Sequence, residues 1–87
     1  MSQKSVEIYT WSTCPYCMRA KQLLDSKGAG YNEFDVTMGG PKKDEMLSRA
    51  PDARTVPQIF IGDTYVGGSD ELAALERTGK LDELLAG

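Results

Sequence analysis

The stretch Cys14-Pro15-Tyr16-Cys17 follows a short apolar segment rich in β-forming residues, Val-Glu-Ile-Tyr-Thr at 6–10, and precedes a helical pattern. These two cysteines are the only ones in the chain. Two thiols at this spacing, at the start of a helix that follows a strand, can close a disulfide within one helical turn. The stretch therefore predicts a strand–helix unit that carries a redox site rather than a structural bridge.

The length and composition predict one small domain, 1–87, with an ordinary core. A net charge of −3 gives no general reason to bind nucleic acid or an anionic membrane. No apolar run approaches the roughly 18 residues that cross a bilayer, and residues 1–5 show no signal-peptide core. We therefore expect a cytoplasmic protein, whose reducing surroundings keep cysteine pairs open.

The chain contains no histidine. Histidine-based acid–base chemistry and a Cys/His zinc site are therefore excluded, and two thiolates supply only half of the four ligands of a structural zinc site. We expect no metal held within one chain. A metal shared between two chains or with an outside ligand stays open.

The remaining patterns divide the chain into alternating strands and helices. We expect strands at 6–10, 31–36, 58–61 and 64–66, helices at 15–27, 41–49 and 71–77, and a last amphipathic turn or two near the C-terminus. The order β-α-β-α-β-β-α predicts an α/β fold with a four-stranded mixed sheet flanked by helices.

Periodicity also predicts which side chains face the core. In the first helix we expect Met18, Ala20, Leu23 and Leu24 to point inward, and in the second Met46, Leu47 and Ala50. For the third helix, Ser69 or Asp70 is the expected N-cap.

The positions of the two cysteines at the N-terminus of the first expected helix predict different roles for them. The first N–H groups of a helix lack intrahelical partners and carry partial positive charge, so the amides near Tyr16 and Cys17 favour a thiolate on Cys14. We expect Cys14 to be an accessible, ionised nucleophile at neutral pH. Cys17, one turn inside the helix, is expected to be shielded and to remain a thiol. Cys14 would attack a disulfide and Cys17 would resolve the product.

Three segments together resemble the glutaredoxin family, and in particular its small bacterial dithiol members. They are Cys14-Pro15-Tyr16-Cys17, Thr55-Val56-Pro57 and Gly67-Gly68-Ser69-Asp70. The first is similar to the dithiol active site, the second to the cis-proline loop of thioredoxin-like folds, and the third to a glutathione-binding turn. The resemblance runs from Val6 to Leu85 and implies a thioredoxin-like fold.

The resemblance implies glutathione as a co-substrate, with no tightly bound cofactor. The backbone of Val56, beside a cis Pro57, would pair with the cysteinyl part of glutathione, and the amides of Ser69 and Asp70 would hold its γ-glutamyl carboxylate. The implied glutathione-binding residues are Tyr16, Lys43, Thr55, Val56, Pro57, Gly68, Ser69 and Asp70.

One position departs from the family pattern. Many glutaredoxins have a lysine three residues before the first cysteine, where this chain has Trp11. We expect Lys43 or Arg54 to bind the glycyl carboxylate of glutathione instead, and Trp11 to pack beside the site.

The resemblance also implies partners: glutathionylated or disulfide-bonded proteins, and glutathione reductase indirectly. A compact polar domain gives no reason to expect more than a monomer. Two alternatives stay open. One is a redoxin reduced by thioredoxin reductase; the other is a carrier that bridges an iron–sulfur cluster between two chains through Cys14 and glutathione.

Overall fold

The computed structural model describes residues 4–86 and contains four strands and four helices within that range. The elements are β1 (Val6–Thr10), α1 (Pro15–Ser26), β2 (Asn32–Asp35), α2 (Pro41–Arg49), β3 (Gln58–Ile61), β4 (Thr64–Gly67), α3 (Ser69–Arg77) and α4 (Lys80–Ala86). The expected strands and helices are confirmed, with shifts of one or two residues at several ends. The expected last turns form a complete helix, α4.

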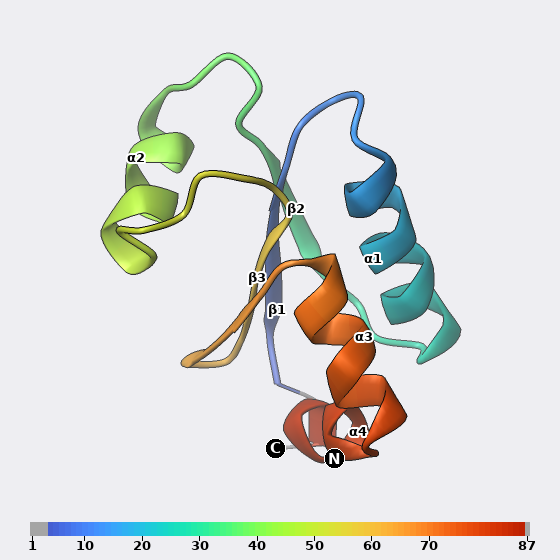
Figure 1. Ribbon diagram of the computed structural model, residues 1–87. Helices are drawn as coiled ribbons and strands as arrows, with labels where there is room; N and C mark the ends of the chain where they lie inside the picture. Colours follow the sequence, from blue (N-terminus) through green and yellow to red (C-terminus); the bar gives the residue numbers. More distant parts are fainter. Residues whose placement is uncertain (1–3, 87) are drawn as a thin grey trace.

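The strands form one mixed sheet in the order β2-β1-β3-β4. β1 pairs parallel with β2 and antiparallel with β3, and β3 pairs antiparallel with β4. The crossover through α1 gives the parallel pair, and the turn at Gly62-Asp63 gives the antiparallel hairpin. This is the predicted thioredoxin-like arrangement. Figure 1 shows α2 on one side of the sheet and α1 and α3 on the other, with α4 beyond the end of α3.

Two clusters of buried side chains follow from the alternation along β1 and β3. One lies against α1, α3 and α4; its members are Val6, Ile8, Ala20, Leu24, Ala29, Ile59, Ile61, Leu72, Leu81 and Leu85. The other lies toward α2 and contains Tyr9, Cys14, Cys17, Val36, Met46, Ala50, Val56 and Phe60. Because successive strand residues point to opposite faces, one strand supplies both cores. Both cysteines belong to the second cluster.

Local chemistry explains where α1 begins and ends. Cys14 is the N-cap residue, with extended backbone angles, and Pro15 occupies the first helical turn. Proline is tolerated there because its missing N–H would have no intrahelical partner. Gly28 follows the helix with φ +68°, in the left-handed region where glycine carries no steric cost.

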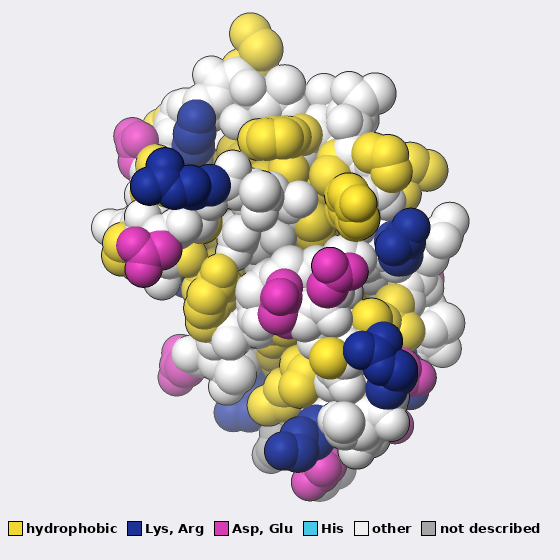
Figure 2. Space-filling model, viewed as in Figure 1, with side chains coloured by type: hydrophobic (Ala, Val, Ile, Leu, Met, Phe, Trp, Pro, Cys, Tyr) yellow, Lys and Arg dark blue, Asp and Glu magenta, His cyan; other side chains and the backbone are white. Residues whose placement is uncertain are grey.

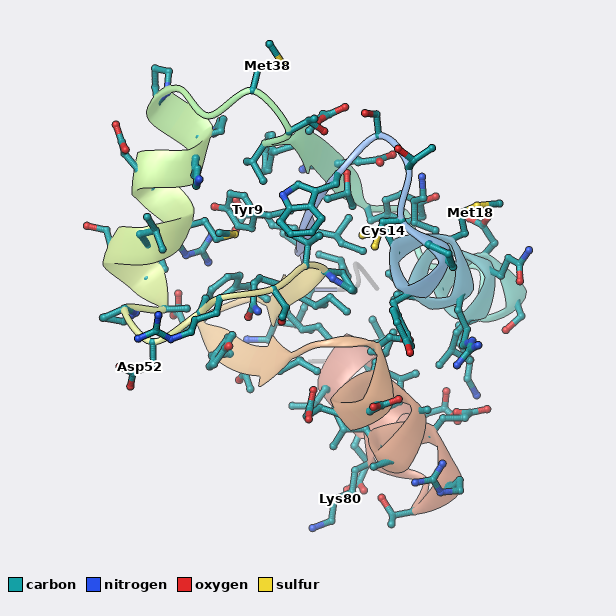
Figure 3. All side chains as sticks on the ribbon, turned by 45° about the horizontal axis from the view of Figure 1, so that its top comes forward. Tyr9, Cys14, Met18, Met38, Asp52 and Lys80 are labelled. Carbon is teal, nitrogen blue, oxygen red and sulfur yellow. The ribbon has the colours of Figure 1, made fainter. Side chains whose placement is uncertain are left out.

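Two expectations about inward-facing residues are wrong. Met18 is 57% exposed, because the buried stripe of α1 is Cys17, Ala20 and Leu24, and Met18 lies to one side of it. Figure 3 shows the Met18 side chain on the outer side of α1. In α2, Met46 and Ala50 are buried as expected, but Leu47 is 37% exposed.

The expected N-cap of α3 is also wrong. The helix begins at Ser69, and Gly68 is its N-cap. Glycine has no side chain to cap the helix, so Glu71 at the third helical position accepts a hydrogen bond from the Gly68 amide at 2.8 Å. The cap therefore comes from inside the helix rather than from Ser69 or Asp70.

The N-terminal segment and the C-terminal helix are joined by backbone pairing. The Lys4 amide donates to the Leu85 carbonyl at 3.0 Å, and both Leu81 and Leu85 are buried. Among residues 4–86, no helix is long and apolar enough to cross a membrane.

Candidate active site

The Cys14 sulfur sits at the positive end of α1. The Cys17 amide donates a hydrogen bond to Cys14 Sγ over 3.2 Å. This is the interaction expected at a helix N-terminus, where backbone N–H groups lack partners. Cys14 is less accessible than expected: 8% of its surface is exposed. The exposed fraction nevertheless opens into a groove.

Cys17 lies beneath this position and is almost fully enclosed, with 1% of its surface exposed. Burial raises the pKa of the Cys17 thiol to about 12, and the hydrogen bond with Cys14 acts in the same direction. The Trp11 amide and the Lys21 charge act in the opposite direction. Cys17 is shielded, as expected, and its raised pKa favours the thiol over the thiolate at neutral pH. Both thiols are free in this structure.

A groove of about 510 Å³ runs past Cys14. Three segments far apart in the sequence meet there: the start of α1, the loop before β3, and the start of α3. The residues that line it are Trp11, Thr13, Cys14, Pro15, Tyr16, Thr55, Val56, Pro57, Gly68, Ser69, Asp70 and Glu71. Figure 2 shows hydrophobic side chains gathered in the upper part of the molecule in this view, with acidic side chains below them.

The loop before β3 brings a backbone carbonyl to the sulfur. The Val56–Pro57 peptide bond is cis, as expected from the resemblance. The Cys14 thiol donates toward the Val56 carbonyl oxygen over 3.8 Å. Gln58 Nε2 donates to the Thr55 carbonyl over 2.8 Å and fixes the loop from below.

The start of α3 forms the opposite wall of the groove. Ser69 and Asp70 are the first two residues of the helix, so their amides are among those without intrahelical acceptors. The Asp70 side chain is exposed, whereas Ser69 is buried. Free amides beside an exposed carboxylate offer an anion site and a cation site side by side.

A second, adjoining pocket of about 330 Å³ carries the basic side chains. Lys43 and Arg54 both line it, and it shares Trp11, Thr55 and Val56 with the groove. Trp11, which is 45% exposed, thus lies where the two hollows meet. The structure brings seven of the eight residues expected to bind glutathione to the groove; Lys43 lies in the adjoining pocket.

Two lining residues were not among those expected at the site: Thr13 and Glu71. Thr13 precedes Cys14 and was available from adjacency alone. Glu71 had a signal of its own, because an acidic residue three positions after a helix N-cap is typical of a capping box. The signal was obscured because the N-cap is glycine rather than serine or threonine.

A dithiol at a helix N-terminus, beside the strand-preceding loop of a mixed sheet, defines a thioredoxin-like thiol–disulfide oxidoreductase. Comparison with known proteins gives the family. The glutaredoxin family model matches residues 6–66. A glutaredoxin from Pseudomonas aeruginosa is 54% identical over 81 residues, which cover 93% of this chain and 95% of that protein. Glutaredoxin 3 from Escherichia coli is 51% identical over 81 residues, covering 93% and 96%.

Solved structures agree. The solution structure of glutaredoxin from Brucella melitensis has a TM-score of 0.82 and 52% identity, and covers 99% of this chain and 92% of that one. A buckwheat glutaredoxin–glutathione complex has a TM-score of 0.79 and 32% identity, covering 92% and 74%. The chain belongs to the glutaredoxin family, whose members are thiol–disulfide oxidoreductases.

Proposed function

We propose that this chain is a glutathione-dependent oxidoreductase that reduces glutathione mixed disulfides and protein disulfides. One observation carries the proposal: the Cys14 sulfur accepts a hydrogen bond from the Cys17 amide over 3.2 Å and lines a groove, while the Cys17 sulfur is buried. A nucleophile needs both an anion-stabilising donor and access to its substrate. Of the two thiols, Cys14 has both.

The first reaction removes glutathione from a substrate. The Cys14 thiolate attacks the glutathione sulfur, a new sulfur–sulfur bond forms on Cys14, and the substrate leaves as a thiolate that takes a proton from water. A second glutathione thiolate then attacks the glutathione sulfur of this mixed disulfide. Oxidised glutathione leaves and the Cys14 thiolate is regenerated.

For a protein disulfide, Cys17 completes the reaction. Cys14 first forms a mixed disulfide with one substrate sulfur. The Cys17 thiol then loses its proton to solvent, and its sulfur attacks Cys14 Sγ and releases the second substrate thiolate. The enzyme is left oxidised by two electrons, as the Cys14–Cys17 disulfide, until glutathione reduces it.

The groove suits the parts of glutathione. The Val56 backbone pairs with the cysteinyl unit, flanked by Tyr16, Thr55 and Pro57. At the start of α3, the amides of Ser69 and Asp70 hold the γ-glutamyl carboxylate beside Gly68, and the Asp70 carboxylate holds the ammonium. Lys43 or Arg54, in the adjoining pocket, binds the glycyl carboxylate. The buckwheat complex, a relative that binds glutathione, supports this assignment. A cytoplasmic location and a monomeric state stay predictions.

The test is turnover with a glutathionylated peptide and with a disulfide-bonded protein, each supplied with glutathione, glutathione reductase and NADPH. We expect Cys14→Ser to lose both activities by at least about a hundredfold. Cys17→Ser should keep the first and lose the second. Equal loss in both variants on the glutathionylated peptide would refute the roles.

A parallel assay with thioredoxin reductase in place of glutathione and its reductase distinguishes the proposed function from a redoxin that thioredoxin reductase reduces. Turnover with thioredoxin reductase alone would show that glutathione is not the electron donor. Visible absorption after anaerobic reconstitution with iron and sulfide would favour the cluster carrier.

A further inference from the structure

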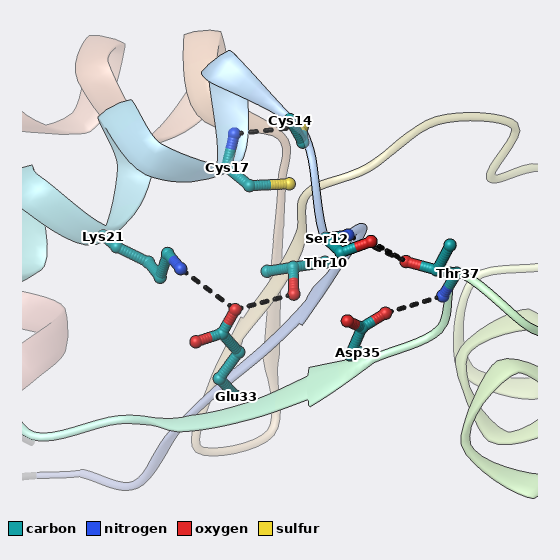
Figure 4. Close-up of polar contacts among 8 residues, drawn as sticks. All are labelled: Thr10, Ser12, Cys14, Cys17, Lys21, Glu33, Asp35 and Thr37. Atoms are coloured by element: carbon teal, nitrogen blue, oxygen red, sulfur yellow. Dashed lines mark hydrogen bonds and ion pairs between the residues drawn. The ribbon is translucent and has the colours of Figure 1, made fainter.

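A charged cluster lies against the inner end of the dithiol. Lys21 Nζ is 3.0 Å from Glu33 Oε2, and Thr10 Oγ1 donates to the same oxygen over 2.8 Å. Three elements contribute: Lys21 from α1, Glu33 from β2 and Thr10 from β1. Figure 4 shows this cluster with Cys17 and its inward-pointing sulfur on the same side of α1.

Helix geometry brings Lys21 into range of Cys17. The two residues are four positions apart on α1, and side chains at this spacing are neighbours on one helix face. Among the described residues 4–86, the Lys21 ammonium is a positive charge that lowers the pKa of the Cys17 thiol. Thr10 and Cys17 are each 1% exposed, whereas the Lys21 and Glu33 side chains are 27% and 36% exposed.

The positive charge of Lys21 matters for the resolving step, in which Cys17 attacks the mixed disulfide on Cys14. Before Cys17 attacks the Cys14 mixed disulfide, its sulfur has to become negative in a buried place. Burial opposes that change, and the largest contribution to the raised pKa of Cys17 is desolvation. Within residues 4–86, the Trp11 amide and Lys21 favour the anion. Any change in the charge that Lys21 presents therefore changes the fraction of Cys17 able to attack.

We infer that the Lys21–Glu33 pair governs the rate at which Cys17 resolves the mixed disulfide: Lys21 supplies positive charge to the Cys17 sulfur, and Glu33 restrains it. Lys21 is thus a positioning residue for the second step. This inference rests on the proposed roles of Cys14 and Cys17, but not on glutathione as the electron donor.

The contacts of Glu33 keep its carboxylate ionised, so that it offsets part of the Lys21 charge. The Thr10 hydroxyl and the Lys21 ammonium hold the pKa of Glu33 below its usual range, so Glu33 is ionised at neutral pH. It neutralises part of the Lys21 charge and is a poor acceptor for the Cys17 proton, which leaves to solvent. The other titratable groups that act on the pair are the Cys17 thiol, the Tyr31 hydroxyl and Asp35. Burial raises the pKa of the Tyr31 hydroxyl further above neutral pH, so it adds no charge to the pair.

The test follows ring closure with Ellman's reagent, an aromatic disulfide that needs no glutathione site. Attack by the Cys14 thiolate releases one coloured thiolate and leaves a mixed disulfide. Attack by Cys17 on Cys14 Sγ releases the second thiolate and forms the Cys14–Cys17 disulfide. The second absorbance phase therefore measures resolution, independently of reagent concentration. Cys17→Ser should show the first phase alone.

We expect the two members of the pair to act in opposite directions. Lys21→Gln should slow the second phase roughly two- to fivefold near pH 7, and Glu33→Gln should speed it by a similar factor, the range set by partly exposed charges. The pH profile of this phase should move to higher pH in Lys21→Gln and to lower pH in Glu33→Gln. A merely structural role would slow or speed both variants alike.

Charge-matched controls lie elsewhere on the surface. Lys42→Gln removes the ion pair between Lys42 and Glu45, both on α2. Glu76→Gln removes the ion pair between Glu76 of α3 and Lys27 at the end of α1. Both should resolve at the wild-type rate. Equal rates in Lys21→Gln and Glu33→Gln, or changes in the same direction, would overturn the inference while leaving the proposed function intact. Absence of a second phase in the wild-type protein would overturn both.

Discussion

At the scale of single residues, the two cysteines differ because of where their sulfurs lie rather than what surrounds them in sequence. Cys14 is the N-cap of α1 and contacts a groove, while Cys17 is one turn inside and belongs to the buried core. The unpartnered amides of the helix N-terminus point toward the N-cap side chain, and the Cys17 amide donates to Cys14 Sγ. Burial penalises an anion anywhere. This difference supports the proposed roles of Cys14 as nucleophile and Cys17 as resolving thiol.

Alkylation of single thiols tests this separation. In Cys14→Ser, Cys17 is the only thiol left. Burial is the largest cause of the raised pKa of Cys17 and persists in this variant, so we expect negligible reaction with iodoacetamide near pH 7 and a rate that rises with pH. Cys17→Ser, with Cys14 in the groove, should react faster near pH 7. Modification of Cys17 at neutral pH as fast as a cysteine in an unfolded peptide would contradict the assignment.

At the scale of elements, α3 matters because its first turn is a wall of the groove. Gly67 and Gly68 precede the helix, and Gly67 has φ +110°, a conformation that glycine adopts without strain. A Cβ added at either glycine would lie 3.2 Å from the Glu71 side chain. The turn is thus packed against its own capping residue, which keeps the Ser69 and Asp70 amides facing the groove.

Removal of this cap is a direct test. Glu71→Ala should lower the free energy of unfolding by about 1 kcal/mol, since the Gly68 amide loses its acceptor. Urea denaturation measures the change. Glu83→Ala is a suitable control, because Glu83 also lies in the first turn of a helix and makes no side-chain hydrogen bond or ion pair within residues 4–86. An equal loss in both variants would show that the cap contributes nothing specific.

The elements themselves were predictable from sequence, since β propensity, helical periodicity and the Gly and Pro positions all agree. The burial of individual side chains was less so. Met18 and Leu47 are apolar residues at the edge of a helix stripe, and only packing against the sheet decides that both stay exposed. The burial of Cys14 and the role of Glu71 depend on the approach of α3 and the 55–57 loop, which are distant in sequence.

The Lys21–Glu33 pair was beyond prediction for a similar reason. Its partners are 12 positions apart and belong to a helix and a strand. The register of β1 against β2, which places Thr10 opposite Asp35, brings the Thr10 hydroxyl within reach of Glu33. No local pattern in the sequence marks this contact.

At the scale of the whole molecule, charged pairs connect the layers around the sheet. Arg49 of α2 bonds Glu7 of β1 at 2.9 Å and lies over the Phe60 ring of β3 at 3.8 Å. Lys27, at the end of α1, pairs with Glu76 of α3 and Asp82 of α4 at 2.7 and 3.0 Å. Each contact joins elements that the chain connects only indirectly.

The dependence of stability on acid pH follows from the direction in which the pKa values of three carboxyl groups are shifted. Hydrogen bonds from Thr10 and Lys21 lower the pKa of Glu33 from its ordinary value of 4.5. Asp35 shifts in the same direction because of Thr37, and Glu45 because of Tyr9 and Lys42. A carboxyl whose pKa is lower in the folded state stabilises the fold above its unfolded pKa, and this contribution is lost as pH falls through the folded pKa.

We therefore expect the urea midpoint of the reduced protein to be nearly constant from about pH 7 to pH 5 and to fall below about pH 4.5. Glu33→Gln should start lower at neutral pH and lose less on acidification, because one of the linked carboxyls is gone. Glu83→Gln, which removes an exposed carboxylate of α4, should follow the wild-type curve. Parallel decline of the wild-type and Glu33→Gln proteins below pH 4.5 would show that Glu33 is not linked to folding, and that the contacts from Thr10 and Lys21 do not persist in solution.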